Sequence, residues 1–279
     1  AQVKLDKLMK IAKLVGSSVD LTSYITTYNT GTAAEINTAT ANLNTALAPT
    51  DKTSSITNPN FNTNASGWTA STAPAWGSNE IEYWQKNFDI NQTISGLPAG
   101  IYVVKVQGFE RPVDASSAQR TVYLNGWDML NSRFYATASG VKVFQTLKNY
   151  FAETTSPAGV AVDGLTFPNS MGDAQSAFAA GLYDNELSYV VVDATGSLTL
   201  GVSNVYDGNK AGRWIIMDNF RLYYYGPLAI PTLTVPQTSL FITNVEGTTK
   251  TFDVSGANLT TDITITAPAG ITLSGTNLV

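Results

Sequence analysis

The sequence contains no cysteine and no histidine, and these two absences exclude much common chemistry. Without cysteine there is no disulfide and no thiolate nucleophile, and without either residue there is no Cys/His zinc site. Catalysis by Ser-His-Asp or Cys-His is excluded as well, because both need an imidazole base. An enzyme made from this chain would depend on carboxylates, lysine, tyrosine or a bound metal.

Charge is also scarce. Charged residues make up 13% of the 279 residues, the net charge is −5, and no basic cluster occurs. This argues against nucleic acid or an anionic membrane as a partner. No apolar run approaches the roughly 20 residues of a membrane span, so we expect no membrane insertion. The first residues, AQVKLDKLMK, lack the apolar core of a signal peptide, so we expect any such peptide to have been removed.

What is abundant is Thr, Ser, Asn and Gly. Uncharged polar surface is common in secreted β-proteins, so we expect the protein to be secreted or on the outer cell surface.

Residues 1–50 carry apolar stripes with helical spacing. Leu5, Leu8 and Ala12 share one face before Gly16, and residues 33–47 repeat the pattern before Pro49. The stripes predict a helical segment that is too small to fold alone. We favour docking on the domain that follows. Binding of a partner, or membership of a larger helical region, is the alternative.

Residues 53–226 predict the main domain, an antiparallel β-sandwich, because strand patterns dominate and helices are short. The stretch 89–111 predicts two antiparallel strands joined by a turn at Gly96–Gly100. Asn125-Gly126, a strong turn signal, is expected to close a strand over 121–124. Further elements are expected at 81–84 and 213–225 (strands), 187–202 (a hairpin) and 170–180 (a helix).

Pro227 and Pro231 predict a stiff linker to a third region. Residues 231–279 alternate like a partial immunoglobulin-type domain. The 48 residues that follow Pro231 (279 − 231) fall well short of the roughly 100 that such a fold uses. We therefore expect a longer natural chain with other domains. The alternative is an extra strand pair of the main domain.

Three motifs in the main domain resemble the galactose-binding-like jelly roll of non-catalytic carbohydrate-binding modules. They are Asn58-Pro59-Asn60-Phe61 with Gly67-Trp68, the run QTISGLPAGIY from Gln92 to Tyr102, and Trp214 with DNFRL from Asp218 to Leu222. AQSAF from Ala174 and LTLG from Leu198 resemble versions in secreted surface proteins of glycan-foraging Gram-negative bacteria. The tail resembles the immunoglobulin-like repeats that follow such modules.

The resemblance implies a mainly β jelly roll that binds a polysaccharide or other glycan at the cell surface and is not an enzyme. The alternative is a structural or adhesive spacer without a sugar site, since this fold also serves such roles. A binder should expose at least one Trp or Tyr beside polar groups in a concave site, whereas a spacer should bury all five Trp.

A sugar presents a flat C–H face and hydroxyl groups, so its site needs an exposed aromatic plane and polar donors. Trp76 and Trp127 lie in loop-like sequence and are the candidate platforms, with a packed loop anchor as the alternative. Trp68 and Trp214 are expected in the core, and Trp84 fits either role.

Two arginines at strand ends, Arg111 and Arg213, can donate paired hydrogen bonds to vicinal hydroxyls or to a uronic carboxylate. Solvated surface is the alternative for each. If the protein binds glycans, Trp76 and Trp127 should lie at one rim of the sandwich with Arg111 near them.

Asp218 shares a strand face with apolar residues, so its carboxylate must be hydrogen-bonded, paired or bound to a metal. The resemblance implies a structural Ca²⁺ held partly by an acid of the last strand, and Asn62 stands at the matching N-terminal position. An Asp218 satisfied by backbone is the alternative. Glycosidases use a pair of carboxylates, and Glu80, Glu82 and Asp89 are candidates for such a pair. Nothing in their spacing, however, places two of them on opposite sides of a cleft.

Overall fold

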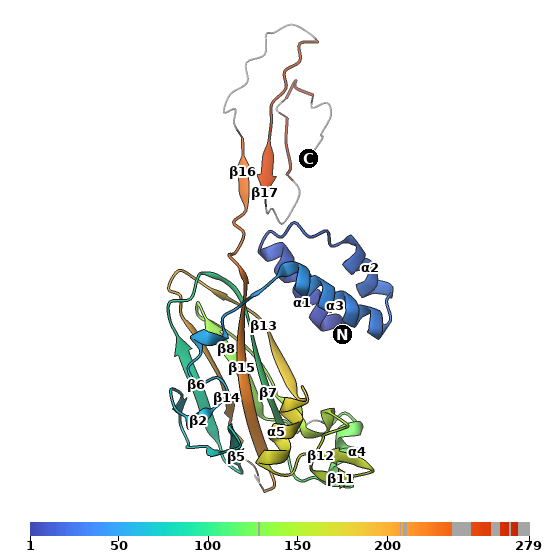
Figure 1. Ribbon diagram of the computed structural model, residues 1–279. Helices are drawn as coiled ribbons and strands as arrows, with labels where there is room; N and C mark the ends of the chain where they lie inside the picture. Colours follow the sequence, from blue (N-terminus) through green and yellow to red (C-terminus); the bar gives the residue numbers. More distant parts are fainter. Residues whose placement is uncertain are drawn as a thin grey trace.

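The computed structural model describes residues 1–127, 129–206, 208, 211–235, 247–257, 263–267 and 269–272. Within these ranges the chain folds into a β-sandwich of two sheets with a layer of helices on one side (Figure 1). The predicted class, a mainly β antiparallel sandwich preceded by helices, is confirmed.

The larger sheet is organised around two long strands that pair with each other, β7 (Gly100–Arg111) and β15 (Trp214–Gly226). It has seven strands among the described residues, and its pairs are antiparallel except where β10 meets β7. The remaining strands are β1 (Thr50–Asp51), β4 (Ala75–Gly77), β5 (Glu80–Trp84), β10 (Lys148–Asn149) and β13 (Asp184–Val192).

The smaller sheet lies across the core from the first and is antiparallel throughout. Its order is β3-β6-β14-β8-β9. The strands are β3 (Thr69–Ala70), β6 (Phe88–Ile94), β8 (Ser132–Ala138), β9 (Val141–Gln145) and β14 (Leu198–Asn204).

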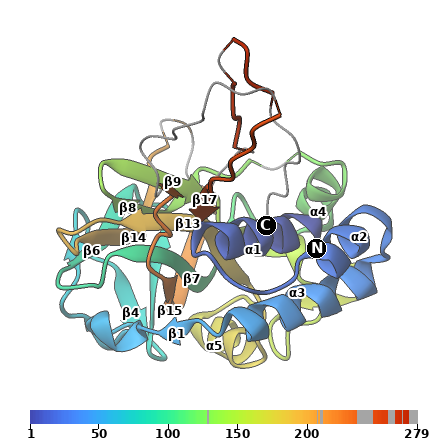
Figure 2. The same cartoon turned by 90° about the horizontal axis from the view of Figure 1, so that it is seen from above.

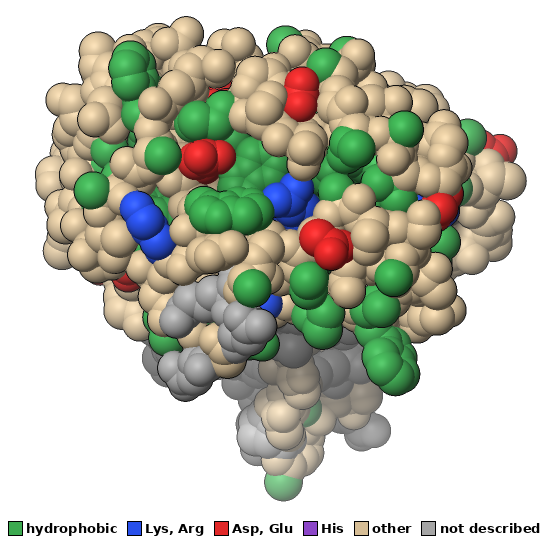
Figure 3. Space-filling view, turned by 90° about the horizontal axis from the view of Figure 1, so that it is seen from below, with side chains coloured by type: hydrophobic (Ala, Val, Ile, Leu, Met, Phe, Trp, Pro, Cys, Tyr) green, Lys and Arg blue, Asp and Glu red, His purple; other side chains and the backbone are tan. Residues whose placement is uncertain are grey.

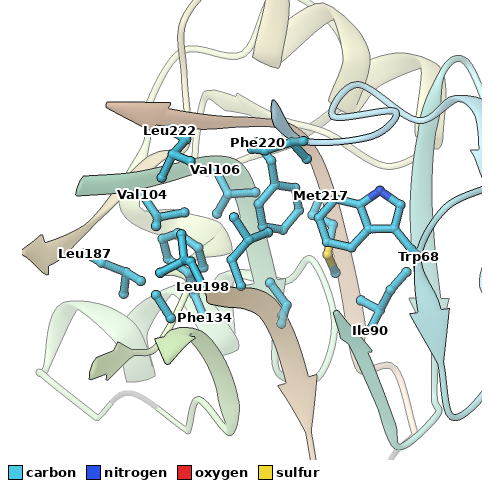
Figure 4. Packing of buried hydrophobic residues seen from close by; sticks show 14 of the residues in the cluster. Trp68, Ile90, Val104, Val106, Phe134, Leu187, Leu198, Met217, Phe220 and Leu222 are labelled. Carbon is cyan, nitrogen blue, oxygen red and sulfur yellow. The ribbon is translucent and has the colours of Figure 1, made fainter. Parts of the chain in front are cut away.

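The core between the sheets follows directly from period-two alternation. On β6, Ile90 and Ile94 are buried while Thr93 is exposed, and on β8 Phe134 is buried while Arg133 is exposed. Side chains from both sheets meet in one cluster, and Trp68, which was expected in the core, packs 4.7 Å from the Phe220 ring centroid (Figure 4). Burial of the apolar side chains in this cluster supplies most of the driving force for folding.

β7 differs from the other strands because both of its faces are covered, and eleven of its twelve residues are buried. One face points into the sandwich core. The other lies under the N-terminal helices at one end and under a second apolar cluster at the other. This explains why its sequence reads as a continuous apolar run rather than as an alternating one.

The N-terminal helices dock on the outer face of the larger sheet, on the side away from the smaller sheet (Figure 2). They are α1 (Gln2–Leu14), α2 (Thr22–Thr30) and α3 (Ala33–Leu47). Leu5 and Ile11 of α1 and Leu43 of α3 are fully buried against Ile101 and Val103 of β7. In the described part of the chain, no helix combines the length and the hydropathy that crossing a bilayer requires.

A charged group is buried in the same interface. Lys7 of α1 and Lys105 of β7 both pair with Glu186 of β13, the second at 2.7 Å, and Lys7 also donates to the Leu187 carbonyl. Burial alone would raise the pKa of Glu186, but the two ammonium groups hold it at about 2. Helix docking therefore includes an ion triad as well as apolar packing.

The second apolar cluster is built by the chain between β9 and β13 and covers the other end of the same sheet face. Phe109 of the sheet contacts the rings of Tyr150, Phe178 and Tyr183 there, and Trp214 packs beside Phe109 in the same cluster. The remaining short elements are β2 (Asn62–Ala65), α4 (Ser117–Leu124), β11 (Val160–Val162), β12 (Leu165–Phe167), α5 (Met171–Ala179), and the 3₁₀ turns at Thr53–Ser55 and Tyr150–Ala152.

Several expectations about pairing are wrong. β6 and β7 do not pair with each other, because the turn at Gly96–Gly100 carries the chain from one sheet to the other. β13 and β14 likewise belong to different sheets and form no hairpin. Residues 121–124 are helical, because Ser116 caps α4 by accepting from the Gln119 amide, and Asn125-Gly126 ends a helix instead of a strand.

About half of residues 231–279 lies outside the described residues, namely 236–246, 258–262, 268 and 273–279. The described part includes β16 (Thr232–Thr234) and β17 (Ser255–Ala257), which pair with each other and not with either sheet of the sandwich. The immunoglobulin-like assignment of this region stays a prediction.

Candidate functional site

Three large side chains form a row across the end of the larger sheet. The register places Trp214 of β15 opposite Trp84 of β5 on one side and opposite Arg111 of β7 on the other. All three point to the outer face, away from the sandwich core. Trp214 is 3% exposed and Arg111 6%, whereas Trp84 is 44% exposed. The row therefore ends in an aromatic ring that solvent can reach.

Aromatic rings surround the Arg111 guanidinium. Its carbon lies 5.0 Å from the Trp214 ring centroid, 5.1 Å from Trp84 and 5.6 Å from Tyr150. Its Nη1 donates to Asn169 Oδ1 at 3.0 Å, and its Nε has no partner among the described residues. Burial lowers the pKa of Arg111, while Tyr150, Asp114 and Glu82 oppose that change. An arginine keeps its charge in such surroundings.

Two carboxylates also lie at this end of the sheet, one on β5 and one just after β7. Glu82, one step along β5 on the same face as Trp84, accepts from Trp214 Nε1 at 2.6 Å. Asp114 follows β7 and is exposed. The surface at this end of the sandwich is hollowed, with apolar side chains at its floor and charges of both signs around it (Figure 3).

Trp84 is held in place from two sides. The Arg111 guanidinium stacks on its ring, and the Gln85 amide oxygen, in the orientation that satisfies both donors, accepts from Trp84 Nε1 at 3.2 Å and from the Gly212 amide at 3.0 Å. Gln85 has a left-handed φ of 55°, which turns the chain sharply just after the strand. A fixed, half-exposed indole needs little ordering when a flat ligand stacks on it.

The residues predicted as platforms lie elsewhere. Trp76 is 47% exposed in the edge strand β4, opposite Ile81, and its Nε1 donates to the Phe61 carbonyl at 2.6 Å. Trp127 follows α4 and is 74% exposed. Among the described residues no hydrogen bond, ion pair or ring contact joins either indole to Arg111. Whether they contact a ligand stays a prediction.

Arg213 is not a solvated rim residue. It is 3% exposed, it pairs with the buried Glu110, and its guanidinium stacks 4.3 Å from the Tyr206 ring centroid. Its Nη groups also donate to the Met129 carbonyl. Arg111 is buried as well, so the alternative of solvated surface is wrong for both arginines, and whether either one contacts a glycan stays a prediction. Strand ends suggest exposure, but here loops fold over them.

The sequence left the role of Trp84 open and did not single out Tyr150 or Asn169. One signal was available: Glu80, Glu82 and Trp84 alternate with Ile81 and Tyr83, which marks one polar face of β5. Tyr150 and Asn169 approach Arg111 from the chain between α4 and α5. No local signal reports such a contact.

Asp218 has an unexpected neighbour. The antiparallel register pairs Met217 with Ile81, so the next residues, Asp218 and Glu80, adjoin each other on the outer face. Glu80 is fully buried, and neither of its carboxylate oxygens has a hydrogen-bond partner among the described residues. The same holds for Asp218 Oδ1. Helix α5 lies close by, since Gln175 donates to the Ser78 carbonyl.

Burial disfavours the charged forms of both carboxyl groups of this pair. Burial first, and then the charges of Asp218 and Glu82, raise the pKa of Glu80 to about 9. Burial raises the pKa of Asp218 to about 7, against the opposing backbone hydrogen bond of Asn219. Bare buried carboxylate oxygens are the ligands that Ca²⁺ prefers, so these two residues fit that ion. Asn62, the expected partner, is exposed instead.

Two carboxylates are fewer than most metal centres use. Within the described ranges, no group of three or more His, Cys, Asp or Glu side chains lies together. Further ligands would have to be backbone or amide oxygens. The buried position of Glu80 also counts against glycoside hydrolysis, because a carboxylate without exposed surface cannot reach a glycan.

Comparison with known proteins identifies no family. No family model matches the chain, and no curated protein matches it either. Among solved structures, the carbohydrate-binding module TmCBM61 in complex with β-1,4-galactotriose aligns at 17% identity and a TM-score of 0.35, over 60% of this chain and 95% of that one. The insecticidal crystal protein Cry2Aa aligns at 12% identity and a TM-score of 0.27, over 52% and 16%. Likenesses this distant do not bear on function, which is argued below from the residues.

Proposed function

We propose that this protein is a non-catalytic glycan-binding module and that its sugar site is the end of the sandwich around Trp84 and Arg111. The observation that carries the proposal is a half-exposed indole, fixed by a guanidinium 5.1 Å from its ring centroid, beside a carboxylate. Trp84 would stack on the C–H face of a sugar ring. Glu82, Asn169 and Asp114 would meet its hydroxyl groups.

The charge of the site favours a neutral sugar. Arg111 contributes one positive charge, while Glu82 and Asp114 contribute two negative ones that act on it. A uronic carboxylate placed here would meet two carboxylates for one guanidinium, and that guanidinium is stacked between rings. A stacked aromatic contributes about 0.5–1.5 kcal/mol beyond its buried area, so single sites should bind weakly. Repetition of the module on a surface would raise the avidity.

The alternative is a structural or adhesive spacer in a longer surface protein. A spacer was expected to bury all five Trp, but Trp76, Trp84 and Trp127 are each more than 40% exposed. This favours binding. Either role places the protein outside the cell, where polysaccharides and surface proteins occur.

We also propose that Glu80 and Asp218 hold a structural Ca²⁺ between β5 and β15. Three carboxylate oxygens without partners support this. When bound, the cation would neutralise the two charges that burial otherwise disfavours, and would tie the edge strand β5 to the central strand β15.

The test of the sugar site is affinity electrophoresis against a panel of neutral and acidic polysaccharides, followed by fluorescence titration with the ligand found. Trp84→Ala should weaken retention about tenfold, the equivalent of 1.4 kcal/mol, with little change in melting temperature. Trp127→Ala is the matched control, because it also removes one exposed indole. Arg111→Lys should weaken binding too, since lysine lacks the planar fork.

Two results would overturn the proposal. If the unaltered protein retains no glycan of the panel, it is a spacer. If Trp127→Ala abolishes retention while Trp84→Ala binds normally, the platform is the one that the sequence predicted.

A further inference from the structure

The smaller sheet has a second face, which looks to solvent on the side away from the helices (Figure 2). On β8, Phe134 and Ala136 point into the core, so Arg133, Tyr135 and Thr137 point outward. On β9, Val143 packs on the core, so Lys142 and Phe144 point outward. Phe144 is 59% exposed, and Arg133 and Lys142 are exposed as well.

Two cations on this face lack counter-ions. Lys142 Nζ lies 3.8 Å from the Tyr135 ring centroid, and the Arg133 guanidinium lies 5.5 Å from that of Phe144. Neither takes part in an ion pair within the described part of the chain. Asp89, on the same face, is occupied by the Tyr135 hydroxyl at 2.7 Å and by the Asn91 amide at 3.2 Å.

The middle of this face is polar and carries small side chains. The register runs from Asn91 on β6 through Gly201 on β14 to Tyr135 on β8, so the middle of the row has no side chain. A Cβ on Gly201 would lie 2.3 Å from the Ile90 carbonyl oxygen, so only glycine fits. In the next row, the hydroxyls of Thr93 and Thr199 bond to each other at 2.8 Å. The close approach of the β6 backbone explains this glycine.

The spacing of the cations suits an extended ligand. Lys142 lies opposite Thr137 on β8, four residues from Arg133. At ~3.4 Å per residue the two backbone positions are roughly 14 Å apart along the strand, and both charged groups lean towards the rings of Tyr135 and Phe144 that lie between them. A short stretch of polysaccharide that lies along β8 and β9 can meet both cations and the Phe144 ring.

From these observations we infer that the outer face of the smaller sheet binds an acidic polysaccharide, with Lys142 and Arg133 meeting its carboxylate or sulfate groups and Phe144 stacking on a ring between them. Hydroxyl groups, one exposed ring and two separated cations match a chain of charged sugars. A protein partner would call for a larger apolar patch than Phe144 provides. This site is separate from the Trp84 end of the molecule, where two carboxylates oppose an acidic ligand.

The experiment measures binding of the full chain to oligogalacturonate and to dextran sulfate, which separate carboxylate from sulfate recognition, with dextran as the uncharged comparison. Lys142→Gln combined with Arg133→Gln should weaken binding of the preferred acidic glycan at least tenfold. Phe144→Ala should weaken it severalfold. Binding of the unaltered protein should fall as salt rises.

Lys4→Gln is the matched control, because Lys4 is exposed on α1, far from this face. It removes one positive charge, as each of the two substitutions on β8 and β9 does. It should bind normally, and so should Trp84→Ala. The inference is overturned if neither acidic glycan binds at low salt, if dextran binds the Trp84→Ala variant as well as they do, or if Lys4→Gln weakens binding as much as the double variant does. Normal binding by the double variant would overturn it too. None of these results decides whether Trp84 binds a neutral glycan.

Discussion

Replacing Glu186 by glutamine is expected to undock the N-terminal helices, because it leaves two ammonium groups facing each other at a buried interface. The side chains of Lys7 and Glu186 are 10% and 11% exposed, and that of Lys105 is 24% exposed. Lys105 can therefore turn towards water, but Lys7 cannot do so without moving α1. Breaking a buried pair by removing one partner typically costs about 3–5 kcal/mol.

The pKa of Glu186 leads to a similar magnitude. It falls from 4.5 to about 2 because the charges of Lys7 and Lys105 outweigh burial. At ~1.36 kcal/mol for each pH unit between these values, the charged form stabilises the fold by about 3 kcal/mol. Since the folded pKa is lowered, this stability is complete above about pH 4.5 and is lost as the pH falls towards 2. Glu186→Gln should therefore be less sensitive to acid in that window.

Lys7→Met supplies the contrast. Methionine can fill the buried volume, and the Glu186–Lys105 pair remains, so the cost should stay under about 1 kcal/mol. Adding Lys7→Met to Glu186→Gln removes the buried cation and should restore most of the lost stability. Burial lowers the pKa of Lys7, which is consistent with its charge being the unfavourable partner once the carboxylate is gone.

The assay combines guanidinium unfolding with hydrogen exchange of α1 and α3, which reports on docking directly. The reasoning is refuted if Glu186→Gln changes the free energy of unfolding by less than about 0.5 kcal/mol and leaves exchange unchanged. It is refuted as well if the double variant is no more stable than Glu186→Gln, because Lys7 would then not be the cause.

Two further predictions concern calcium and a crowded glycine. Added Ca²⁺ should raise the melting temperature of the unaltered protein but not of Glu80→Gln or Asp218→Asn, and the rise should be larger at pH 8 than at pH 5.5, because protons compete for carboxylates whose pKa values are raised to about 9 and about 7. An equal rise in the variants would place the ion elsewhere. Gly100→Ala should destabilise the protein by more than about 2 kcal/mol, since φ is 145° and a Cβ would lie 2.2 Å from the Gly226 carbonyl oxygen. Gly140→Ala, with φ of 76° and open space around it, should cost about 1 kcal/mol, and thermal unfolding that ranks the two in the opposite order would contradict the packing argument.

Local sequence patterns determined several elements of this protein and the face that each one buries, but they did not predict helix α4 or the strands β8 to β12. Helices α1 and α3 follow from apolar stripes that end at Gly16 and Pro49, and α5 and β15 lie within a residue of their expected ranges. Trp68 and Trp214 were expected in the core and lie there, 9% and 3% exposed. Such features are settled by the periodicity of side chains along one element, which sequence reports directly.

Only the tertiary structure decided which strands pair, and with that the composition of the site. The alternation of apolar and polar side chains predicts that β6 buries one face, and the apolar run of β7 predicts a buried strand. Neither pattern predicts that the two strands belong to different sheets. Trp84, Trp214 and Arg111 are far apart in sequence and meet because β5, β15 and β7 pair in one register. Glu80 meets Asp218 for the same reason. Pairing between distant strands depends on the packing of the whole sandwich, so no local stretch of sequence encodes it.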